Sequence, residues 1–533
     1  MQRKTMKTVM QGALLLSVAS LIAKILSAVY RVPFQNMVGN TGFYVYQQIY
    51  PIYGIGMTFA LSGLPMFISK LVAESETAQT KLALLSRIFV LLAGFSLLLF
   101  LGLQGLAVPI ASGMGDPGLA PIIRAVSWMF LFSPFLAISR GYFQGEYDMR
   151  PTALSQLVEQ TVRVTVILVV AYWAMKHQWN VYRMGTWTMS SAAIAAVFAS
   201  AVMLYYVRHQ HVKFIAAIHQ PVDQTYSSLV KRLLIEGGTI SLFASMMVLL
   251  QLVDSFTVMR GLMIQGLPSL TAKSIKGVYD RGQPLVQLGL VVATSFSSSL
   301  LPSLTEALNR GNHRQFVRQA NTVVRISVAI ATAAAVGLVA LMPEVNVLLF
   351  GNQQGTGMLS VYVLSIIFAT LIMIDNSILQ SLNQFAVTIA GLTIGLLVKV
   401  VFNQWAVVHF GAIGASWITV VALLVMAGFL RQQLRKEQLR AFKRGFLLKL
   451  VLIAVIMLIS VRLVIPVGSW LTAAWTPRMA ALVEAVLGIL VGVIVFMYLA
   501  LKFKLLTLRE WLLLPQADRW LRWFKKINAG GSQ

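Results

Sequence analysis

Two segments of the chain align without a gap: GYFQGEYDMRPTALSQLVEQTVRV, residues 141–164, and SILQSLNQFAVTIAGLTIGLLVKV, residues 377–400. The strongest matches are Gln144 with Gln380, Thr152 with Thr388, and residues 162–164 with residues 398–400. The offset is 236 residues, counted from Gln144 to Gln380. A match at so long an offset predicts an internal duplication of the kind found in membrane transporters.

A second set of matches supports the duplication at nearly the same offset: residues 42–44 with 277–279, and residues 64–65 with 301–302. Six apolar spans separate equivalent positions. An even number of spans returns the chain to the same side of a membrane, so the copies run parallel about an axis along the membrane normal. Such transporters place the substrate path between the copies. We therefore predict two six-helix lobes with a path between them.

The composition is that of a polytopic membrane protein. Of 533 residues, 58% are hydrophobic and only 11% are charged, and the mean hydropathy is +0.77. Soluble domains carry about 25% charged residues, so several soluble domains are excluded. The chain has no cysteine, which excludes disulfides, cysteine-ligated zinc and thiol catalysis. The expected fold class is all-α.

Apolar stretches of about 20 residues, the length that spans a bilayer as a helix, recur along the whole chain. We expect about fourteen of them, at residues 8–30, 46–69, 83–110, 121–143, 152–175, 184–207, 233–258, 283–305, 320–342, 358–381, 386–406, 411–430, 446–466 and 480–501. The predicted domains are an N-terminal lobe, a C-terminal lobe, two further helices and a tail, at residues 1–225, 226–440, 441–505 and 506–533.

The net charge of +26 follows from 43 Lys and Arg against 17 Asp and Glu. Most of the cations fall in short loops, and placing the N-terminus in the cytoplasm puts most of them on the inner side. Both termini are then cytoplasmic. No compact basic and aromatic surface of the single-strand-binding type is visible, so nucleic acid is not an expected partner.

The tail mixes aromatic residues with cations from about Thr507 onward: Trp511, Trp520, Trp523 and Phe524 with Arg519, Arg522, Lys525 and Lys526. This pattern predicts an amphipathic helix lying at the membrane surface on anionic lipid. A helix that binds a protein partner is the alternative.

Lys24 lies inside the first apolar span, about 24 Å from its start in a hydrocarbon layer of about 30 Å. A charge at that depth costs at least about 2.5–3.5 kcal/mol and normally faces a bundle interior or a wet cavity. We predict that Lys24 contacts an anionic substrate, with snorkelling to the outer interface as the alternative. Arg31, which closes the span, is either a second contact or an interfacial anchor.

Arg281 opens the eighth span in YDRGQPLVQL, and the repeat places it close to Gln47, near the centre of the outer mouth. We predict a substrate contact here by the same argument, with Arg260 as a weaker companion. Four tyrosines of the second span are interpreted mainly as an aromatic belt, with sugar contact as the alternative: Tyr44, Tyr46, Tyr50 and Tyr53.

Asp254, in QLVDSF of the seventh span, is an isolated acid at membrane depth. Because charges inside membranes usually pair, we predict an ion pair with Lys24 or Arg31. The alternative is a bound monovalent cation whose uptake resets the transporter.

Charged residues of three other spans are interpreted as structural or secondary. Glu159 and Arg163 stand four residues apart in the favourable order, which predicts a structural pair on one helix. Lys399 is the repeat mate of Arg163, but Gly395 stands four residues before it, so the pair has no equivalent. Asp375, in the tenth span, is too distant from both to be assigned a partner.

The sequence has no motif for the common catalytic classes. A GxxxxGK[ST] loop for ATP, HExxH and GxSxG are all missing. We therefore expect no catalysis, no cofactor and no metal. The energy for any transport would come from the membrane potential or a monovalent cation.

The first repeat segment, taken from Arg140 to Val164, together with three more stretches, resembles the polysaccharide-biosynthesis branch of the MOP exporter superfamily. The stretches are GALLLSVASLIAKILSAVYRVPF, GFYVYQQIYPIYGIGMTFALSGLPMFISKLVAE and QPLVQLGLVVATSFSSSLLPSL. The nearest group is that of the YtgP/SpoVB-type proteins, relatives of the MurJ lipid II flippases. The resemblance covers nearly the whole chain and is most specific in RGYFQG…PTA.SQ..EQ.

This resemblance implies a flippase of the bacterial cell membrane that moves undecaprenyl-diphosphate-linked sugar, above all lipid II, from the inner to the outer leaflet by alternating access. The implied partners are that lipid, anionic membrane lipid and the cell-wall synthesis machinery, and we expect a monomer. In the family, arginines of the first and eighth helices line a central cavity. Lys24 and Arg31 take the first-helix positions and Arg281 the eighth-helix position.

This chain departs from the family at two positions. Lys24 stands where arginine is usual, so a point charge replaces a bidentate fork. Gly42 stands near the place of an acidic residue in Gram-negative relatives.

Other functions remain open. The substrate could be another undecaprenyl-diphosphate-linked glycan of capsule or teichoic type, or a drug cation exported in the MATE manner. A drug-cation site should be acidic or aromatic, and 17 acids against 43 bases, with Lys24 in the path, disfavour it. A scaffold of cell-wall assembly that transports nothing would not need cations at membrane depth.

Overall fold

The computed structural model describes residues 2–212, 225–291, 308, 310–436, 439, 441–442, 445–472 and 474–511. Every regular element within these residues is helical, so the predicted all-α class is confirmed. Twelve stretches are long and apolar enough to span a membrane. The chain is therefore a multi-pass membrane protein.

The twelve stretches correspond to the fourteen expected spans. One of them, Leu14–Glu74, is 61 residues long and covers the first two expected spans. The expected eighth span, 283–305, lies mostly outside the described residues. The remaining spans appear with ends shifted by a few residues, as for the expected span 152–175, which is the helix Arg150–Lys176.

The seventh span differs from the prediction. The expected span 233–258 is split, and the membrane-length helix is α12, Met246–Ile264. The preceding residues form α10 (Tyr226–Arg232), the π-helical turn η4 (Leu233–Gly237) and α11 (Gly238–Ala244). A π turn followed by adjacent glycines interrupts the regular helix, whereas the apolar composition runs on without a break.

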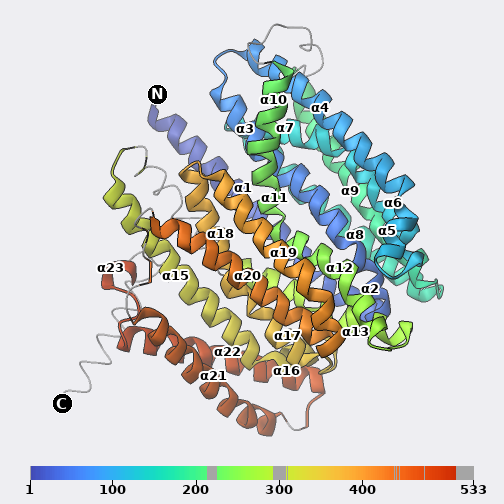
Figure 1. Ribbon diagram of the computed structural model, residues 1–533, viewed down its shortest axis with the longest axis vertical. Helices are drawn as coiled ribbons and strands as arrows, with labels where there is room; N and C mark the ends of the chain where they lie inside the picture. Colours follow the sequence, from blue (N-terminus) through green and yellow to red (C-terminus); the bar gives the residue numbers. More distant parts are fainter. Residues whose placement is uncertain are drawn as a thin grey trace. The chain divides into compact units, whose positions relative to one another are not determined.

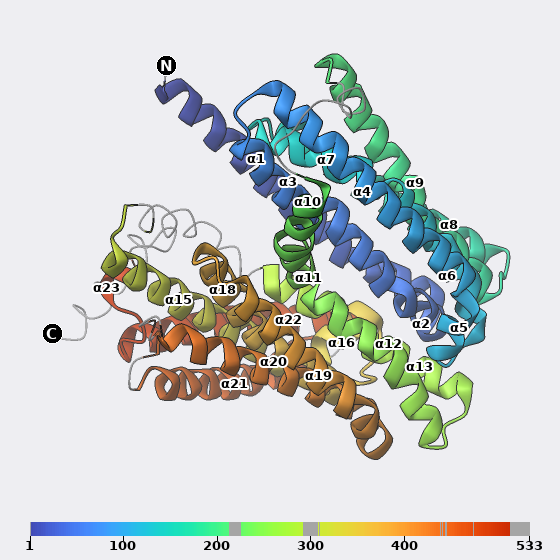
Figure 2. The same ribbon diagram turned by 45° about the horizontal axis from the view of Figure 1, so that its top comes forward.

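The chain divides into two compact units, each described by itself. Unit 1 comprises Met1–Gln287 and Thr388–Ala422. Within it, α8 and α9 lie side by side (Figure 2). Besides α10 to α12, its helices are α1 (Gln2–Val29), α2 (Arg31–Thr58), η1 (Phe59–Gly63), α3 (Leu64–Glu74), α4 (Ala78–Gly105), α5 (Ala107–Gly113), η2 (Pro117–Leu119), α6 (Ala120–Ser127), η3 (Trp128–Leu131), α7 (Ser133–Gly145), α8 (Arg150–Lys176), α9 (Val181–His209), α13 (Ser269–Asp280), α19 (Phe385–Phe410) and the first part of α20 (Ala412–Lys436).

Unit 2 comprises Leu288–Val387 and Leu423–Gln533. Its last two long helices, α21 and α22, pack side by side (Figure 1). The helices are α15 (His313–Ala340), α16 (Met342–Phe350), α17 (Thr356–Val363), α18 (Ser365–Ser381), the second part of α20, α21 (Phe446–Leu471), α22 (Pro477–Lys502) and α23 (Leu508–Trp511). The predicted surface helix of the tail lies almost entirely outside the described residues, which end at Trp511.

The helix α2 has two irregular points and carries Arg31 and several of the tyrosines discussed below. Gly39, inside it, has φ +69°, a left-handed conformation that glycine adopts without strain. Pro51 also lies within it. Proline removes one backbone hydrogen bond and favours a kink. The second half of α2 is buried, including Gln47 and Gln48.

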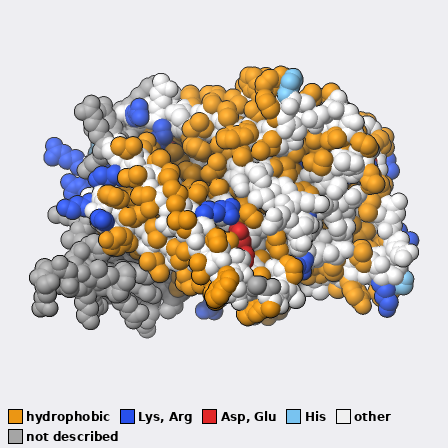
Figure 3. All heavy atoms as spheres, turned by 90° about the horizontal axis from the view of Figure 1, so that it is seen from below, with side chains coloured by type: hydrophobic (Ala, Val, Ile, Leu, Met, Phe, Trp, Pro, Cys, Tyr) orange, Lys and Arg blue, Asp and Glu red, His pale blue; other side chains and the backbone are white. Residues whose placement is uncertain are grey.

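Apolar side chains cover much of the outer surface. Figure 3 shows hydrophobic side chains spread over the visible face, with few charged ones among them. Large exposed residues of this kind include Leu98, Tyr172, Leu448 and Leu463, at 62–75% exposure. A surface of this composition is suited to lipid rather than to water.

Candidate functional site

Arg163 lies midway along α8, only 1% exposed, and four tyrosines surround it. Its Nη2 donates hydrogen bonds to the hydroxyl of Tyr46 at 2.7 Å and to that of Tyr30 at 3.3 Å. The guanidinium carbon lies 3.6 Å from the ring centroid of Tyr53 and 5.7 Å from that of Tyr50. We call Tyr30, Tyr46, Tyr50 and Tyr53 the tyrosine cage. Both cation–π attraction and hydrogen bonds hold the guanidinium in it.

Local sequence explains the tyrosine cage. Tyr46, Tyr50 and Tyr53 stand at spacings of four and three residues, which places them on one face of α2. Tyr30 lies between α1 and α2, and its hydroxyl is 2.7 Å from that of Tyr46. All four are buried. Three of them, Tyr46, Tyr50 and Tyr53, were interpreted together with Tyr44, also buried, as an aromatic belt at the lipid interface, and that interpretation does not hold.

Arg31 begins α2 and is 2% exposed. Its guanidinium carbon lies 4.2 Å from the ring centroid of Tyr50, the ring that Arg163 also contacts. The phenol of Tyr30 interacts with both arginines. Arg31 and Arg163 therefore belong to one cluster, although 132 residues separate them along the chain.

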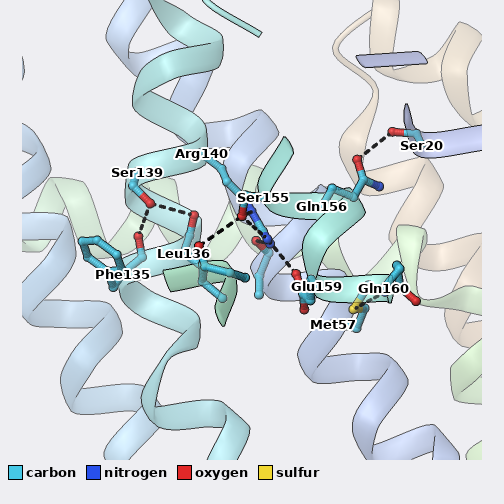
Figure 4. Close-up of polar contacts among 12 residues, drawn as sticks. Ser20, Met57, Phe135, Leu136, Ser139, Arg140, Ser155, Gln156, Glu159 and Gln160 are labelled. Atoms are coloured by element: carbon cyan, nitrogen blue, oxygen red, sulfur yellow. Dashed lines mark hydrogen bonds and ion pairs between the residues drawn. The ribbon is translucent and has the colours of Figure 1, made fainter. Parts of the chain in front are cut away.

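Glu159 pairs with Arg140 of α7, at 2.6 Å, and not with Arg163 as the helical spacing predicts. Arg140 also donates to Ser155 and to the backbone carbonyl of Ala60. Figure 4 shows Arg140 reaching Ser155 and Glu159. The packing of α7 on α8 brings the guanidinium of Arg140 to Glu159, so Arg163 of the same helix contacts the tyrosines instead.

Asp254 of α12 pairs with Lys399 of α19 at 2.7 Å, and not with Lys24 or Arg31. Its second oxygen accepts a hydrogen bond from the hydroxyl of Tyr279 at 2.9 Å, and Asn403 donates to the first at 3.0 Å. Lys399 is fully buried and also donates to Thr419 and to the carbonyl of Ala415. This is a saturated intramembrane ion pair.

Asp375, to which the sequence assigned no partner, forms an ion pair with Arg431 of α20. Both residues belong to unit 2, and Asp375 is fully buried. Arg431 lies one residue beyond the expected span 411–430, so the sequence did not place it at membrane depth and the pair was missed.

The other predicted substrate contacts differ in exposure. Lys24 is exposed on α1, and no hydrogen-bond or ion-pair partner reaches it from the described residues. Arg281 is buried after α13, and its Nη2 donates to Asn40 at 2.7 Å. Arg260 is exposed and donates to the carbonyl of Ser112 at 3.2 Å.

A glycine allows the approach that brings Arg281 to α2. A Cβ atom at Gly277 would lie 2.1 Å from the carbonyl oxygen of Asn40, so no side chain fits between α13 and α2 at this point. The sequence repeat placed Arg281 near Gln47, and the structure joins it to Asn40 of the same helix.

A second cluster, in the predicted outer region, was not foreseen. Asp116 pairs with Lys273 at 3.0 Å and accepts hydrogen bonds from Tyr182 and Tyr44. Burial lowers the pKa of the Lys273 ammonium, but hydrogen bonding with Tyr182 and Asp116 outweighs it and raises that pKa above its ordinary value. The lysine therefore stays charged near neutral pH. Only long-range contacts could reveal this cluster.

A third cluster joins the predicted N-terminal lobe to the start of the C-terminal lobe, inside unit 1. Lys70 of α3 pairs with Glu236 at 2.7 Å, and Arg232 pairs with both Glu74 and Glu236 at 3.0 Å. These side chains are partly exposed, so each contact adds little stability by itself.

Comparison with known proteins decides the family. A family model described as polysaccharide biosynthesis protein matches residues 9–308, more than half of the chain. The chain belongs to that family. An uncharacterized membrane protein of Bacillus subtilis (strain 168), YabM, is 35% identical over 98% of this chain and 97% of its own length.

Two further named proteins are similar in sequence to this chain over most of its length. The lipid II flippase MurJ of Bacillus subtilis (strain 168) is 25% identical over 92% of this chain and 94% of its own length. The stage V sporulation protein B of the same organism is 23% identical over 79% of this chain and 82% of its own length. The predicted kinship with MurJ and SpoVB-type proteins is confirmed.

Solved structures show the same fold. A lipid II flippase MurJ in an inward closed conformation aligns with a TM-score of 0.67 at 15% identity, covering 92% of this chain and 99% of that chain. An inward-facing MATE family transporter of the MOP superfamily aligns with a TM-score of 0.63 at 14% identity, covering 80% of this chain and 98% of that one. This chain therefore has the fold of the MurJ and MATE transporters.

Proposed function

We propose that this family member is a lipid-linked oligosaccharide flippase that moves lipid II from the inner to the outer leaflet. The observation that supports this most is Arg31, a permanent cation buried in the helical bundle with no carboxylate partner among the described residues. A charge in such a setting is costly, and it is normally retained for function. A diphosphate is the anion that a polyprenyl carrier of sugar would bring to it. Kinship with a protein named lipid II flippase favours lipid II among such carriers.

In this proposal, Lys24, Arg31 and Arg281 receive the diphosphate on the path between the two predicted lobes, and Arg260 assists at the outer end. Their charges reduce the cost of taking the headgroup out of water. The lobes rock so that the path opens first inward and then outward. The lipid tail stays in the bilayer along the last two helices.

The membrane potential would drive the outward step. An inside-negative potential favours outward movement of a negative headgroup by about 2.3 kcal/mol per charge per 100 mV. This assumes a bacterial cell membrane with both termini cytoplasmic and a protein that acts as a monomer beside the cell-wall machinery. Uptake of a monovalent cation at Asp254 would first require displacing the ammonium of Lys399.

The decisive experiment replaces an essential lipid II flippase with this chain. In a bacterium depleted of its own flippase, expression of this protein should restore growth and the appearance of lipid II on the outer leaflet. Growth without lipid II exposure, or no rescue by a protein that reaches the membrane, would contradict the proposal.

Variants test the cationic path in reconstituted vesicles. Lys24→Ala and Arg281→Ala should each reduce lipid II flipping at least about tenfold, because each removes a charge-assisted contact. Lys176→Ala is a matched control, since that lysine is exposed at the end of α8. Full activity in both path variants would remove the cationic path from the proposal while leaving the substrate open.

Export of another undecaprenyl-diphosphate-linked glycan remains the second candidate, because the same anion would use the same cations. Vesicles loaded with such a glycan carrier in place of lipid II separate the two. Drug-cation efflux has less support. Every buried acid in the described part of the chain already forms an ion pair with Lys or Arg, so none is available to a drug cation.

A further inference from the structure

Buried charges in unit 1 are not fully balanced. Its four buried acids each hold one cation: Asp116 with Lys273, Glu159 with Arg140, Asp254 with Lys399, and Asp280 with Lys276. Across the described residues, Arg31 and Arg163 have no carboxylate within ion-pair distance. Asp280 lies within electrostatic range of Arg31, but its ion pair is with Lys276. Among the described residues, the permanent positive charges of Arg31 and Arg163 therefore have no buried counter-charge of their own.

These two charges are neighbours and both have spare donors. The guanidinium carbons of Arg31 and Arg163 lie 4.2 Å and 5.7 Å from the same ring centroid, that of Tyr50. Nε of Arg31 and Nη1 of Arg163 are buried and have no hydrogen-bond partner. An arginine cannot lose its proton in a protein, so neither group can escape the cost by becoming neutral. A buried donor without a partner also costs about 1–3 kcal/mol.

We propose that Arg31 and Arg163 form a binding site for one phosphate-class anion, which the tyrosine cage masks when the site is empty. This rests on the proposed function in assigning the anion to a lipid-linked diphosphate. The two-arginine site itself requires only phosphate chemistry, which a free diphosphate shares.

The tyrosine hydroxyls of the cage are groups that an anion can displace from the arginine. Tyrosine hydroxyls are neutral acceptors, whereas a phosphate group is negatively charged and can accept two parallel N–H···O bonds from one guanidinium. An anion would therefore displace the hydroxyls of Tyr30 and Tyr46 from Nη2 of Arg163. The displaced hydroxyls can donate to the anion in turn, because a phenol is both donor and acceptor. The ring of Tyr53 would keep the guanidinium in place.

Access requires α2 to move, because Arg31 is 2% and Arg163 1% exposed. The helix has two weak points for such a movement. Gly39 has a left-handed backbone between Arg31 and Tyr46, and Pro51 lies between Tyr50 and Tyr53. Three of the four cage tyrosines are on α2, whereas Arg163 is on α8. Movement of the part of α2 that follows Gly39 away from α8 would unmask the fork of Arg163, while Arg31, which precedes Gly39, stays in place.

The rival explanation is that the cage is only a clamp that fastens α2 to α8. A clamp would explain the cation–π contacts. It would not explain why two arginines share one ring while each keeps a donor without a partner. The two explanations differ in anion binding, which a clamp does not require.

The test measures binding to the purified full-length protein, by titration calorimetry and by the shift in melting temperature. The probes are inorganic pyrophosphate and undecaprenyl diphosphate without sugar. Wild type should bind at least one of them. Arg163→Gln and Arg31→Gln should weaken that binding at least about tenfold, since each removes hydrogen bonds to a charged group. Arg163→Lys should lie between, because a point charge lacks the bidentate fork.

Two matched variants serve as controls. Arg208→Gln removes an exposed arginine of α9. Tyr172→Phe removes the hydroxyl of an exposed tyrosine on α8, the helix that also carries Arg163. Both should bind the probes as wild type does. If Arg163→Gln does not fold, the comparison of Arg163→Lys and Arg31→Gln with these controls decides.

Each outcome has a defined meaning. Binding of undecaprenyl diphosphate assigns the site to the lipid, and binding of pyrophosphate alone assigns it to a free anion. No binding by wild type, or equal binding by wild type and both arginine variants, overturns the site. Normal lipid II flipping with such equal binding would spare the proposed function. Arginine-dependent binding without any lipid II flipping would spare the site and overturn the function.

Discussion

The repeat aligns Arg163 with Lys399, yet the two buried cations are held in opposite ways. Lys399 has the carboxylate of Asp254, a hydroxyl and a backbone carbonyl, so its charge is neutralised inside the protein. Among the described residues, Arg163 has hydrogen bonds and ring contacts only with neutral tyrosines. The position 236 residues before Asp254 is Val18, so the first copy has no equivalent acid. In the second copy the buried cation forms an ion pair with a carboxylate. In the first copy the buried cation has no carboxylate partner among the described residues.

Side-chain chemistry matches this difference. Lysine is a compact point charge that one carboxylate and a hydroxyl can satisfy. Arginine is planar, so its faces can rest on rings while nitrogens at its edge stay available. An ion pair built with good geometry serves structure, whereas an uncompensated charge is expensive unless a ligand completes it. The difference therefore points to structure at Lys399 and to ligand binding at Arg163.

The largest effect should come from breaking the ion pair between Asp254 and Lys399. Asp254→Ala leaves Lys399 buried and uncompensated, which costs about 3–5 kcal/mol in comparable cases. The melting temperature of the purified protein should fall markedly. The double variant Asp254→Leu with Lys399→Met should recover most of the loss, because apolar residues of similar size often replace a buried pair at little cost. Equal stability of Asp254→Ala and wild type would show that the pair is not structural.

The matching change in the first copy should leave the fold nearly intact. Arg163→Met loses charged hydrogen bonds but also removes an uncompensated buried charge. The two effects oppose each other, so we expect a net change within about 2 kcal/mol. Flipping in vesicles should nevertheless fall about tenfold or more. A stability loss as large as that of Asp254→Ala would make the tyrosine cage a clamp and end the contrast between the copies.

The helical architecture was readable from the sequence for a physical reason. Inside a bilayer every backbone polar group must be satisfied within the segment, so a long apolar stretch can only be a helix or part of a closed barrel. Hydropathy therefore located the spans, and the family resemblance named the fold. The prediction from hydropathy failed at residues 233–245. Apolar composition alone does not reveal the π turn there or the break in the helix before Met246.

Partner choice was much less predictable. The spacing of Glu159 and Arg163 identifies neighbours on one helix, but the packing of Arg140 from α7 decided the pair. Asp254 and Lys399 are 145 residues apart, and no local pattern links them. The repeat did equate Arg163 with Lys399. It could not show that one of them lacks an acid, because that depends on which helices touch.

The smallest effects separate the hydroxyl and ring contributions of the tyrosine cage. Tyr46→Phe removes the hydroxyl that accepts the 2.7 Å hydrogen bond from Arg163. It should destabilise the protein by about 0.5–1.5 kcal/mol, the typical net value of one hydrogen bond, because the hydroxyl of Tyr30 still accepts from the same nitrogen.

Tyr50→Phe is the matched change, because it keeps the ring that both arginines contact, and no hydrogen bond of its hydroxyl occurs within the described residues. We expect a shift below about 0.5 kcal/mol, as for substitutions away from specific contacts. Melting temperatures measured side by side check the order. If Tyr50→Phe were the more damaging of the two, the hydroxyl of Tyr50 would contribute more to the tyrosine cage than the hydroxyl of Tyr46. The hydrogen bond from Arg163 to Tyr46 would then not be the main polar contact that holds the uncompensated charge of the first copy.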